Sequence, residues 1–446
     1  MATTYLTRSI SSTSTPNKLT VSFWLKGGQI TSTQQTIFSI YNTGSANLFY
    51  SIYFSSNGSM YLYWKDTSEI ATLGTTQKFR DTNAWYHFVW EMDTTLATAA
   101  DRIKMYINGE RVTSFEDDLD TITQSKSMDM MENTNGRITI GRGAIGGSDY
   151  YFGGSLSHFY FTDGYAYDAS TFGSTDATTG EWKINTSPSI TMGTNGFTVL
   201  KDGNTITDQS SNSNDFTLGA GTLTKTEDCP SNVYCTFNPL IPQGLAYANG
   251  NLSATHDASS WKTAYGTIAM SGTGKYYFES KVSTLGSYQG VGIVDAEQIS
   301  AGASKFGAVS RGYGYKNDGS KTNNNSDASY GATYTTGDII GCALDLTNGA
   351  IYFSKNGAWQ NSATTSEIAA GTTTNAAYTS ISSSYVYLPA VQIYGSGTNQ
   401  FNAGNGFFGT TAVSSVQNPS SGDTSAEFEY TPPTGFQPIT TKGLNA

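Results

Sequence analysis

Residues 337–360, GDIIGCALDLTNGAIYFSKNGAWQ, constrain the fold more than any other part of the chain. An apolar run at 339–346 is followed by Thr347-Asn348-Gly349 and then by a second apolar run at 351–353. Asn and Gly both tolerate a positive φ, so an Asn-Gly step between apolar runs is the strongest short-range signal for a β-hairpin. The first half of the chain has a similar step at Asn108-Gly109. Two such hairpins in two halves predict two all-β domains.

The composition agrees with this prediction. The chain has 446 residues, a length typical of two or three domains. Charged residues make up 13%, against roughly a quarter in ordinary soluble domains, and aromatic residues also make up 13%. Aromatic rings supply large buried areas, and the 48 glycines supply turns, so strands are favoured over amphipathic helices. We therefore expect an all-β protein with two antiparallel β-sandwich (jelly-roll) domains in series.

The charge of the chain argues against nucleic acid as a partner. Its formal net charge is −11, and no cluster of Lys and Arg supplies the basic surface that nucleic-acid binding needs. The first 16 residues lack the apolar segment of a signal peptide, and no run approaches the ~18 apolar residues of a membrane span. We therefore expect no membrane insertion, and synthesis in a cytoplasm without a secretion signal.

The three cysteines are Cys229, Cys235 and Cys342. Cys342 stands in an apolar run and is typical of a small buried hydrophobic residue. Cys229 and Cys235 are close enough in sequence for a disulfide that closes a small loop, and the sequence leaves open whether they pair. The density of proline in residues 229–244 indicates a linker.

Strand-like segments of the first half lie at 19–26, 35–42, 48–55 and 59–66, at the spacing of a β-sandwich. The pieces that carry a family resemblance are Val21-Ser22-Phe23-Trp24-Leu25-Lys26, Trp85-Tyr86-His87-Phe88-Val89, Lys104-Met105-Tyr106-Ile107-Asn108-Gly109, Ile138-Thr139-Ile140-Gly141, and Phe152, Gly154, Leu156, Phe159 and Phe161. Their order and spacing resemble the laminin-G-like, concanavalin-A-type lectin fold. This resemblance covers about residues 15–170 and implies a jelly roll of two antiparallel sheets.

A second set of pieces follows in the second half: Tyr276-Tyr277-Phe278-Glu279, Val291-Gly292-Ile293, Tyr330-Gly331, Gly337-Asp338, Leu344-Asp345, Lys355-Asn356-Gly357 and Pro389-Ala390-Val391. This order is similar to that of a SPRY domain, which implies another β-sandwich. Phe401-Asn402-Ala403-Gly404 replaces the usual ending of the family pattern, so the path of the final strand stays open.

The predicted organisation has four parts. Residues 1–228 form the laminin-G-like sandwich, with accessory strands at 170–228, and 229–244 form the linker. Residues 245–425 form the SPRY-like sandwich, and 426–446 form an extended C-terminal tail, in which Pro432 and Pro433 exclude a helix. The two domains with a Tyr-Thr-Pro-Pro-Thr-Gly-Phe tail resemble structural proteins of marine and cyanobacterial tailed bacteriophages.

No set of catalytic residues stands out. Glu427 and Glu429 could share one strand face near an aromatic residue, as the two carboxylates of a glycosidase would, but they lie in the predicted tail. His87 and His158 lie in predicted strands and could face each other around a metal, although a structural role is commoner for such histidines. We therefore predict no catalytic residue and no enzymatic activity.

One acidic loop suggests a metal. Glu116, Asp117, Asp118 and Asp120 place four carboxylates in five positions, and oxygen-rich sites of this kind suit Ca²⁺. A solvated acidic loop is the alternative interpretation. Calcium is the only cofactor that the sequence suggests.

Two polar loops are predicted to bind ligands. Carbohydrate sites combine aromatic planes with amide and carboxylate groups, and Asp149, Tyr150 and Tyr151 offer this chemistry in the first domain. In the second domain Lys316, Asn317 and Asp318 begin a polar stretch like the variable loop of a SPRY domain. The alternative for each is a polar loop anchored by an aromatic side chain.

The phage resemblance implies a virion-surface structural protein: a tail fibre, an appendage or a capsid decoration with lectin-like binding to host surface glycans for host attachment. The expected partners are other virion proteins, the host surface glycan and further copies in a homo-oligomer. The sequence leaves open two alternatives, a glycan-degrading tail enzyme (depolymerase) and a purely architectural joint between virion proteins.

Overall fold

The computed structural model describes residues 3–28, 33–145, 148–201, 206–241, 243–299 and 305–442. The chain divides into two compact units, Met1–Lys225 and Thr226–Ala446. Each unit consists mainly of antiparallel sheets, so the predicted all-β fold with two sandwiches is confirmed. Among the described residues, no helix has both the length and the apolar character needed to cross a membrane.

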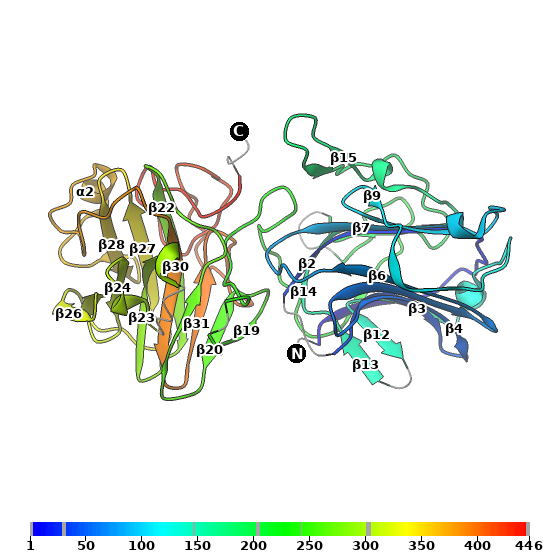
Figure 1. The fold of residues 1–446 in the computed structure, drawn as a ribbon, viewed down its shortest axis with the longest axis horizontal. Coiled ribbons are helices and arrows are strands. Elements are labelled where there is room, and N and C mark those ends of the chain that lie inside the picture. The colour runs from blue at the N-terminus through cyan, green and yellow to red at the C-terminus, as the bar shows by residue number, and fades with distance from the viewer. Residues whose placement is uncertain are drawn as a thin grey trace. The chain divides into compact units, whose positions relative to one another are not determined.

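The first unit is a sandwich of two sheets (Figure 1). The larger sheet has the strand order β10 (Phe115–Asp120), β6 (Glu69–Lys78), β5 (Ser59–Asp66), β4 (Ser45–Phe54), β3 (Gln35–Asn42), β11 (Gly136–Ile140), β1 (Tyr5–Ser9), β18 (Thr217–Ala220). The smaller sheet has the order β17 (Phe197–Val199), β14 (Gly154–Asp163), β2 (Lys18–Gly27), β7 (Tyr86–Asp93), β8 (Ile103–Ile107), β9 (Glu110–Arg111). Short 3-10 helices lie between strands at η1 (Ala99–Asp101) and η2 (Asp129–Met131).

The core of the first unit follows from the alternation of β2. Leu19, Val21, Phe23 and Leu25 point inward and are at most 1% exposed, as the period of two in a strand requires. The ring of Phe23 stacks on Phe159 of β14 with 5.1 Å between centroids. Full burial of such side chains contributes about 1.5–3 kcal/mol each, so the alternation specifies which face of the strand meets the other sheet.

Each sheet of the first unit carries a further layer on its outer face (Figure 1). The hairpin of β12 (Arg142–Ile145) and β13 (Ser148–Tyr151) packs on the larger sheet, where the Thr139 hydroxyl donates to the Arg142 carbonyl at 2.7 Å. Residues 167–192 cover the smaller sheet, with Phe172 and Trp182 packed on its outer side chains. This cover contains η3 (Ala169–Thr171), β15 (Gly173–Thr175) and β16 (Trp182–Ile184).

The acidic stretch at 116–120 is a strand, which corrects the expected loop. This strand, β10, pairs antiparallel with β6, which lies outside the predicted strand segments. β10 is the edge of the larger sheet, and charged side chains are typical of edge strands because they discourage further pairing. The expectation of a loop was wrong because pairing with β6 supplies hydrogen-bond partners for the backbone N–H and C=O groups, whatever the charge of the side chains.

The Asn108-Gly109 step forms the tight turn between β8 and β9. Its two residues have φ values of 47° and 86°, as a two-residue hairpin turn requires. The ring of Trp182 lies against this turn, and a Cβ at Gly109 would come within 2.4 Å of that ring. Glycine is therefore needed here for the backbone conformation and for the close approach.

The second unit also holds two large sheets. The larger has the order β19 (Ala246–Ala248), β20 (Ser253–His256), β31 (Gly397–Asn402), β22 (Lys275–Thr284), β27 (Ile339–Asp345), β28 (Ala350–Lys355), β29 (Ala358–Trp359). The smaller has the order β21 (Trp261–Tyr265), β30 (Tyr387–Tyr394), β23 (Tyr288–Asp295), β24 (Gly312–Lys316), β25 (Ser320–Asn323), β26 (Ser326–Ser329). Short elements complete the unit: α1 (Ala296–Ile299), η4 (Phe306–Ala308), α2 (Thr365–Ala369), β32 (Phe407–Phe408), β33 (Thr411–Ala412).

The two turns predicted in residues 337–360 differ in kind. The loop between β27 and β28 has four residues, and of its Asn-Gly step only Gly349 has a positive φ, of 63°. The Asp345 carboxylate holds this loop by accepting from the Asn348 backbone N–H at 2.9 Å. By contrast, Asn356 and Gly357 have φ values of 49° and 79° and form a two-residue turn. The hairpin is as predicted, but a carboxylate rather than an Asn-Gly turn closes its first loop.

The segment 229–244, predicted as a linker, belongs to the packed second unit. Tyr234 and Cys235 are both 0% exposed, and the Cys235 N–H donates to the Ile439 carbonyl at 2.9 Å. Cys229 and Cys235 are free thiols. Proline density misled the prediction because these prolines flank a strand-like segment whose aromatic and apolar side chains are buried.

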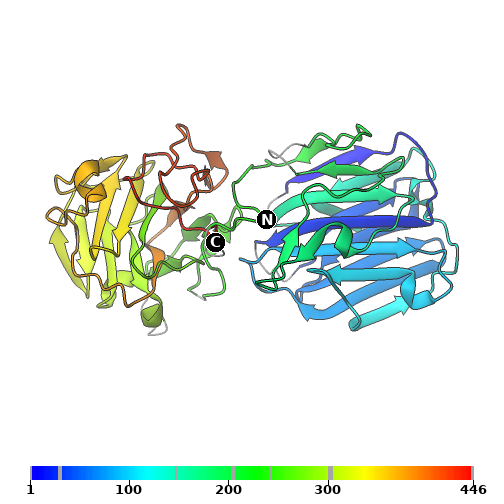
Figure 2. The ribbon, with the colours of Figure 1, turned by 90° about the horizontal axis from the view of Figure 1, so that it is seen from above.

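The C-terminal segment is extended, as predicted, but it also belongs to the body of the second unit (Figure 2). Phe428 and Phe436 are 0% exposed and pack with Tyr277 and Tyr352 on the outer face of the larger sheet. The Tyr277 N–H donates to the Gln437 carbonyl at 2.9 Å. The segment thus acts as a third layer over that sheet rather than as a free exit.

Candidate functional site

The β12–β13 hairpin gathers charged and aromatic side chains on its exposed face. Arg142 donates to the Asp149 carboxylate from Nε at 3.0 Å and from Nη2 at 2.7 Å. The Tyr151 hydroxyl donates to the other oxygen of Asp149 at 3.2 Å. The ring of Tyr5 lies 4.9 Å from the Arg142 guanidinium and 6.1 Å from the Tyr151 ring. We name these four residues, Tyr5, Arg142, Asp149 and Tyr151, the hairpin cluster.

Strand geometry explains which residues join the hairpin cluster. Arg142 is paired with Tyr151 across the hairpin, so the two share a face with Asp149, whereas Tyr150 points to the opposite face. Tyr5 comes from β1, far away in sequence, and its ring lies over Gly219, where a Cβ would come within 2.2 Å of it. Of the predicted ligand residues, Asp149 and Tyr151 therefore meet and Tyr150 does not join them.

Part of the hairpin cluster is open to solvent. The side chains of Arg142 and Asp149 are 22% and 40% exposed. Burial alone would lower the pKa of Arg142, but the hydrogen bonds to Asp149 outweigh it and the pKa is raised. Partial desolvation and the bond to Asp149 raise the pKa of Tyr151. Among the described residues Arg142 Nη1 has no acceptor, so the cluster combines an unpaired donor, a carboxylate and two aromatic side chains.

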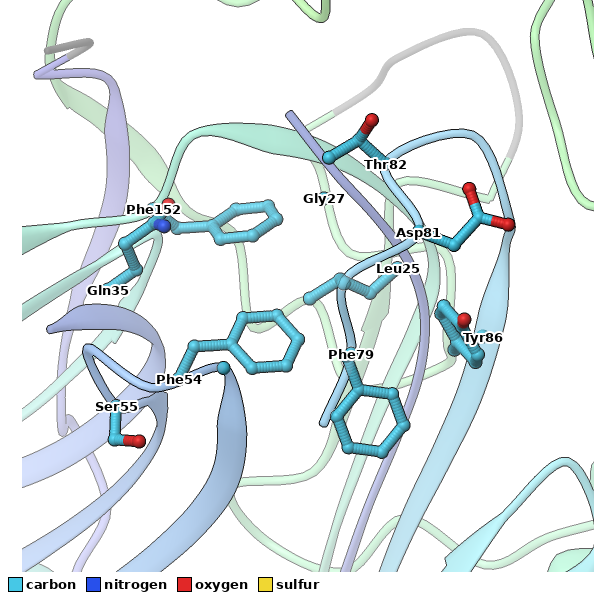
Figure 3. Close-up of a pocket in the computed structure, with 11 residues that line it drawn as sticks. Leu25, Gly27, Gln35, Phe54, Ser55, Phe79, Asp81, Thr82, Tyr86 and Phe152 are labelled. Carbon is cyan, nitrogen blue, oxygen red and sulfur yellow. The ribbon is translucent and has the colours of Figure 1, made fainter. Parts of the chain in front are cut away.

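A pocket lies at the strand ends beside this hairpin, next to Phe152 (Figure 3). The rings of Phe54, Phe79 and Phe152 converge on it, and Asp81 and Gln35 lie at its border. Its volume is about 20 Å³, which is room for roughly one water molecule. A sugar ring does not fit there, so the pocket is a packing gap at the end of the sandwich.

The four acidic residues suggested for calcium do not converge. Glu116 accepts from the Ser59 hydroxyl at 2.6 Å and pairs with Lys78. The Tyr61 hydroxyl donates to Asp117 at 2.6 Å, and the Asp120 carboxylate accepts from the Ile122 N–H at 2.9 Å. Within the described part of the chain, no group of three acidic, histidine or cysteine residues could hold a metal ion. The calcium expectation at Glu116, Asp117, Asp118 and Asp120 therefore finds no geometric support.

His87 is a buried structural residue. Its Nδ1 accepts from the Trp182 indole N–H at 3.0 Å, so its Nε2 carries the proton and donates to the Ser22 hydroxyl at 2.9 Å. Its ring lies between the rings of Trp24 and Trp182, at 4.9 and 6.0 Å. Burial first, and His158 second, lower the pKa of His87 to about 3. Both ring nitrogens are occupied, so the suggested pair with His158 is not arranged to hold a metal.

The predicted loop residues of the second unit are used for contacts within the smaller sheet. The Lys316 ammonium lies 2.8 Å from Asp327 and 3.2 Å from Asp318. The Asn317 side chain accepts from the Gln289 backbone N–H at 2.8 Å. These contacts tie the end of β24 to its turn, to β26 and to β23, and they leave Lys316 only 8% exposed. Lys316 and Asp318 therefore meet, whereas Asn317 contacts a different strand, and all three residues serve the fold of the sheet.

Comparison with known proteins agrees with the two sandwiches. A family model described as the concanavalin A-like lectin/glucanases superfamily, of laminin G type, matches residues 2–169. A model of the SPRY domain matches residues 275–405. The chain carries a concanavalin A-like domain and a SPRY domain in tandem. Both resemblances seen in the sequence are thereby confirmed.

Each of these similar proteins matches only part of this chain. The Ran-binding proteins 9/10 homolog of Drosophila melanogaster is 36% identical over 105 residues, which cover 23% of this chain and 10% of that protein. The ATP-dependent RNA helicase Ddx1 of the same species is 30% identical over 103 residues, which cover 23% of this chain and 14% of that protein. Among solved structures, the SPRY domain of human HERC1 is 20% identical, with a TM-score of 0.29, and covers 37% of this chain and 96% of its own.

The SPRY domain contains a buried carboxyl group, that of Glu279, within the Tyr276-Tyr277-Phe278-Glu279 motif. Glu279 is 0% exposed, and it accepts from the backbone N–H groups of Glu429 and Tyr430, each at 2.9 Å. The Tyr277 hydroxyl donates to it at 3.0 Å. Burial raises the pKa of Glu279 to about 7, against the opposing effect of these hydrogen bonds. Glu279 therefore attaches the C-terminal segment to the SPRY domain.

Glu427 and Glu429, the pair weighed as glycosidase carboxylates, have separate partners. The Glu429 side chain accepts from the Ser414 backbone N–H at 2.6 Å. The Glu427 carboxylate lies against Gly406, where a Cβ would be 2.6 Å from one of its oxygens. Each carboxylate thus contacts its own loop of the SPRY domain.

Proposed function

We propose that this chain is a non-enzymatic structural protein on the surface of a tailed-phage virion, and that its concanavalin A-like domain binds host surface glycans. The observation that carries the glycan-binding part is the hairpin cluster, because aromatic planes beside a carboxylate and a free guanidinium donor suit the apolar and polar faces of a sugar. The match to a lectin-containing superfamily supports the same ligand class.

The placement on a virion rests on domain order and on the C-terminal motif. A laminin-G-like domain, a SPRY domain and the Tyr-Thr-Pro-Pro-Thr-Gly-Phe segment together resemble structural proteins of tailed bacteriophages. Further copies in a homo-oligomer and neighbouring virion proteins are the proposed partners, since symmetry multiplies weak glycan affinities. The similar proteins support no particular partner for this chain, because the matches span only 10% and 14% of those relatives.

Binding of purified host polysaccharide to the full chain, measured by calorimetry, tests the glycan-binding part. Tyr151→Ala should weaken binding roughly tenfold, equivalent to about 1.4 kcal/mol. Tyr165→Ala is the matched control, because Tyr165 is 42% exposed and lies outside the hairpin cluster. Equal affinity of both variants and the wild-type chain would remove the hairpin cluster from the proposal.

Two further measurements separate the alternatives. Size-exclusion chromatography of the polysaccharide after incubation reports chain shortening, which would identify a depolymerase and refute the non-enzymatic role. A cryo-EM map of the particle locates the chain. Burial of the β12–β13 hairpin against a neighbouring virion protein, together with no glycan binding, would identify an architectural joint.

A further inference from the structure

Three aromatic side chains from adjacent strands meet on the smaller sheet of the SPRY domain. Trp261 of β21 and Tyr288 of β23 are both paired with Tyr394 of β30, the strand that lies between them. The ring centroids of Trp261 and Tyr288 are 5.4 and 6.1 Å from that of Tyr394 and 6.0 Å from each other. The three rings thus form one compact group, which we name the aromatic triad.

The aromatic triad does not belong to the core of the domain. On β30 the inward side chains are Val391 and Ile393, both 0% exposed, so Tyr394 lies on the opposite, outer face by strand alternation. Further along this outer face, Phe306 covers the sheet and packs with Tyr265. The triad lies beyond that cover, and Tyr288 is 46% exposed.

The polar groups at the aromatic triad are available. Among the described residues the hydroxyls of Tyr288 and Tyr394 make no hydrogen bond, and the ammonium of Lys305 makes no ion pair. Lys305 Nζ lies 5.8 Å from the centre of the Trp261 ring. This positive charge has no ionic partner within the described part of the chain, and it complements an anionic ligand.

We propose that the aromatic triad and Lys305 form a second glycan-binding site, which takes a carboxylate-bearing sugar residue such as a uronic acid. The apolar face of the sugar packs on Trp261 and Tyr288, and the carboxylate lies at Lys305. This inference rests on the proposed glycan-binding function and deepens it, because it names an acidic glycan and adds the SPRY domain as a contributor. Two sites on one chain would also raise affinity for a polymer through effective concentration.

The test uses the full chain with Tyr151→Ala, so that the hairpin cluster contributes little. Calorimetric titrations with a hexamer of galacturonic acid and with the neutral hexamer maltohexaose compare the acidic and the neutral sugar. In this background Tyr288→Ala should weaken binding of the acidic hexamer roughly tenfold, equivalent to about 1.4 kcal/mol. Lys305→Gln should weaken the acidic hexamer only, and added salt should reduce this difference. Tyr165→Ala is again the control.

The outcomes separate this inference from the proposed function. If Tyr151→Ala alone abolishes binding of the acidic hexamer, the proposed function stands and the second site is refuted. If neither Tyr288→Ala nor Lys305→Gln weakens the acidic hexamer, the second site is refuted as well. Absence of binding to any glycan by the wild-type chain would refute both. Sedimentation velocity completes the test, because dissociation of an oligomer by Tyr288→Ala would assign the aromatic triad to contacts between copies instead.

Discussion

Replacing Glu279 should release the C-terminal segment from the SPRY domain. In the wild-type chain the N–H groups of Glu429 and Tyr430 each donate to the Glu279 carboxyl group at 2.9 Å. The Glu279→Ala variant removes this acceptor. Leaving a buried donor unpaired costs about 1–3 kcal/mol, so these two groups together predict a loss of about 2–6 kcal/mol. Glu279→Gln keeps one acceptor oxygen and the side-chain volume, so roughly half of that loss is expected.

The two variants should also differ in their response to pH. Folding raises the pKa of Glu279 from 4.5 to about 7. A carboxyl group with a raised pKa stabilises the fold fully below its unfolded pKa, and this stabilisation is lost as the pH rises through the folded pKa. The difference of about 2.5 units corresponds to about 3 kcal/mol. The wild-type SPRY domain should therefore lose stability between about pH 4.5 and pH 7, whereas E279Q should lack this part of the pH dependence.

Differential scanning calorimetry of the full chain at pH 5, 6, 7 and 8 measures the effect. The transition that shifts in the Glu279 variants belongs to the SPRY domain, and the transition of the first unit serves as an internal reference. Glu110→Gln is a matched control, because Glu110 is an exposed glutamate of the first unit. Equal pH dependence of the SPRY-domain transition in the wild-type chain and in E279Q would refute the reasoning.

Two further substitutions test the packing of the domains. Trp182→Phe removes the indole donor to Nδ1 of His87. Thermal unfolding of the first unit should therefore show a loss of about 1–3 kcal/mol in the free energy of unfolding. A change below about 0.5 kcal/mol, the usual effect of a surface substitution, would contradict this role. Gly357→Ala introduces a Cβ at a φ of 79° and within 2.6 Å of the Tyr430 ring, whereas Gly180, with a φ of 74°, has nothing within 4 Å of the same position. Calorimetry should therefore show a larger loss of stability for Gly357→Ala than for Gly180→Ala, and equal losses would mean that strain alone, and not the contact with Tyr430, sets the cost.

Only part of the candidate site could be predicted from the sequence. Asp149 and Tyr151 were predicted, because aromatic and acidic residues side by side in a glycine-flanked loop suggest a ligand site. Arg142 could have been found from the alternation within the hairpin, since it lies opposite Tyr151. Tyr5 could not, because its place beside Arg142 depends on the pairing of β1 with β11 and β18 at the edge of the larger sheet.

The same limit explains the acidic strand and the aromatic triad. Four carboxylates in five positions suggested a cation site, but pairing with β6 placed Glu116 beside Lys78 and Asp117 beside Tyr61. The three rings of the triad are separated by 27 and 106 residues along the chain, and register across three strands brings them together. Local sequence patterns do not indicate which residues of neighbouring strands lie opposite each other.

The sequence by itself determined the class of fold, the two domains and most of their strands, because alternation of apolar residues and Asn-Gly turns act over a few neighbouring residues. It also determined the family of each domain, because the order of short motifs along the chain can be read directly from the sequence. The tertiary structure alone decided which polar groups form contacts within the fold and which remain available to a ligand. Lys316 ties β24 to β26, His87 is enclosed by two tryptophans and Glu279 holds the C-terminal segment, because each of these roles depends on partners that only strand pairing and layer packing bring within hydrogen-bonding or stacking distance.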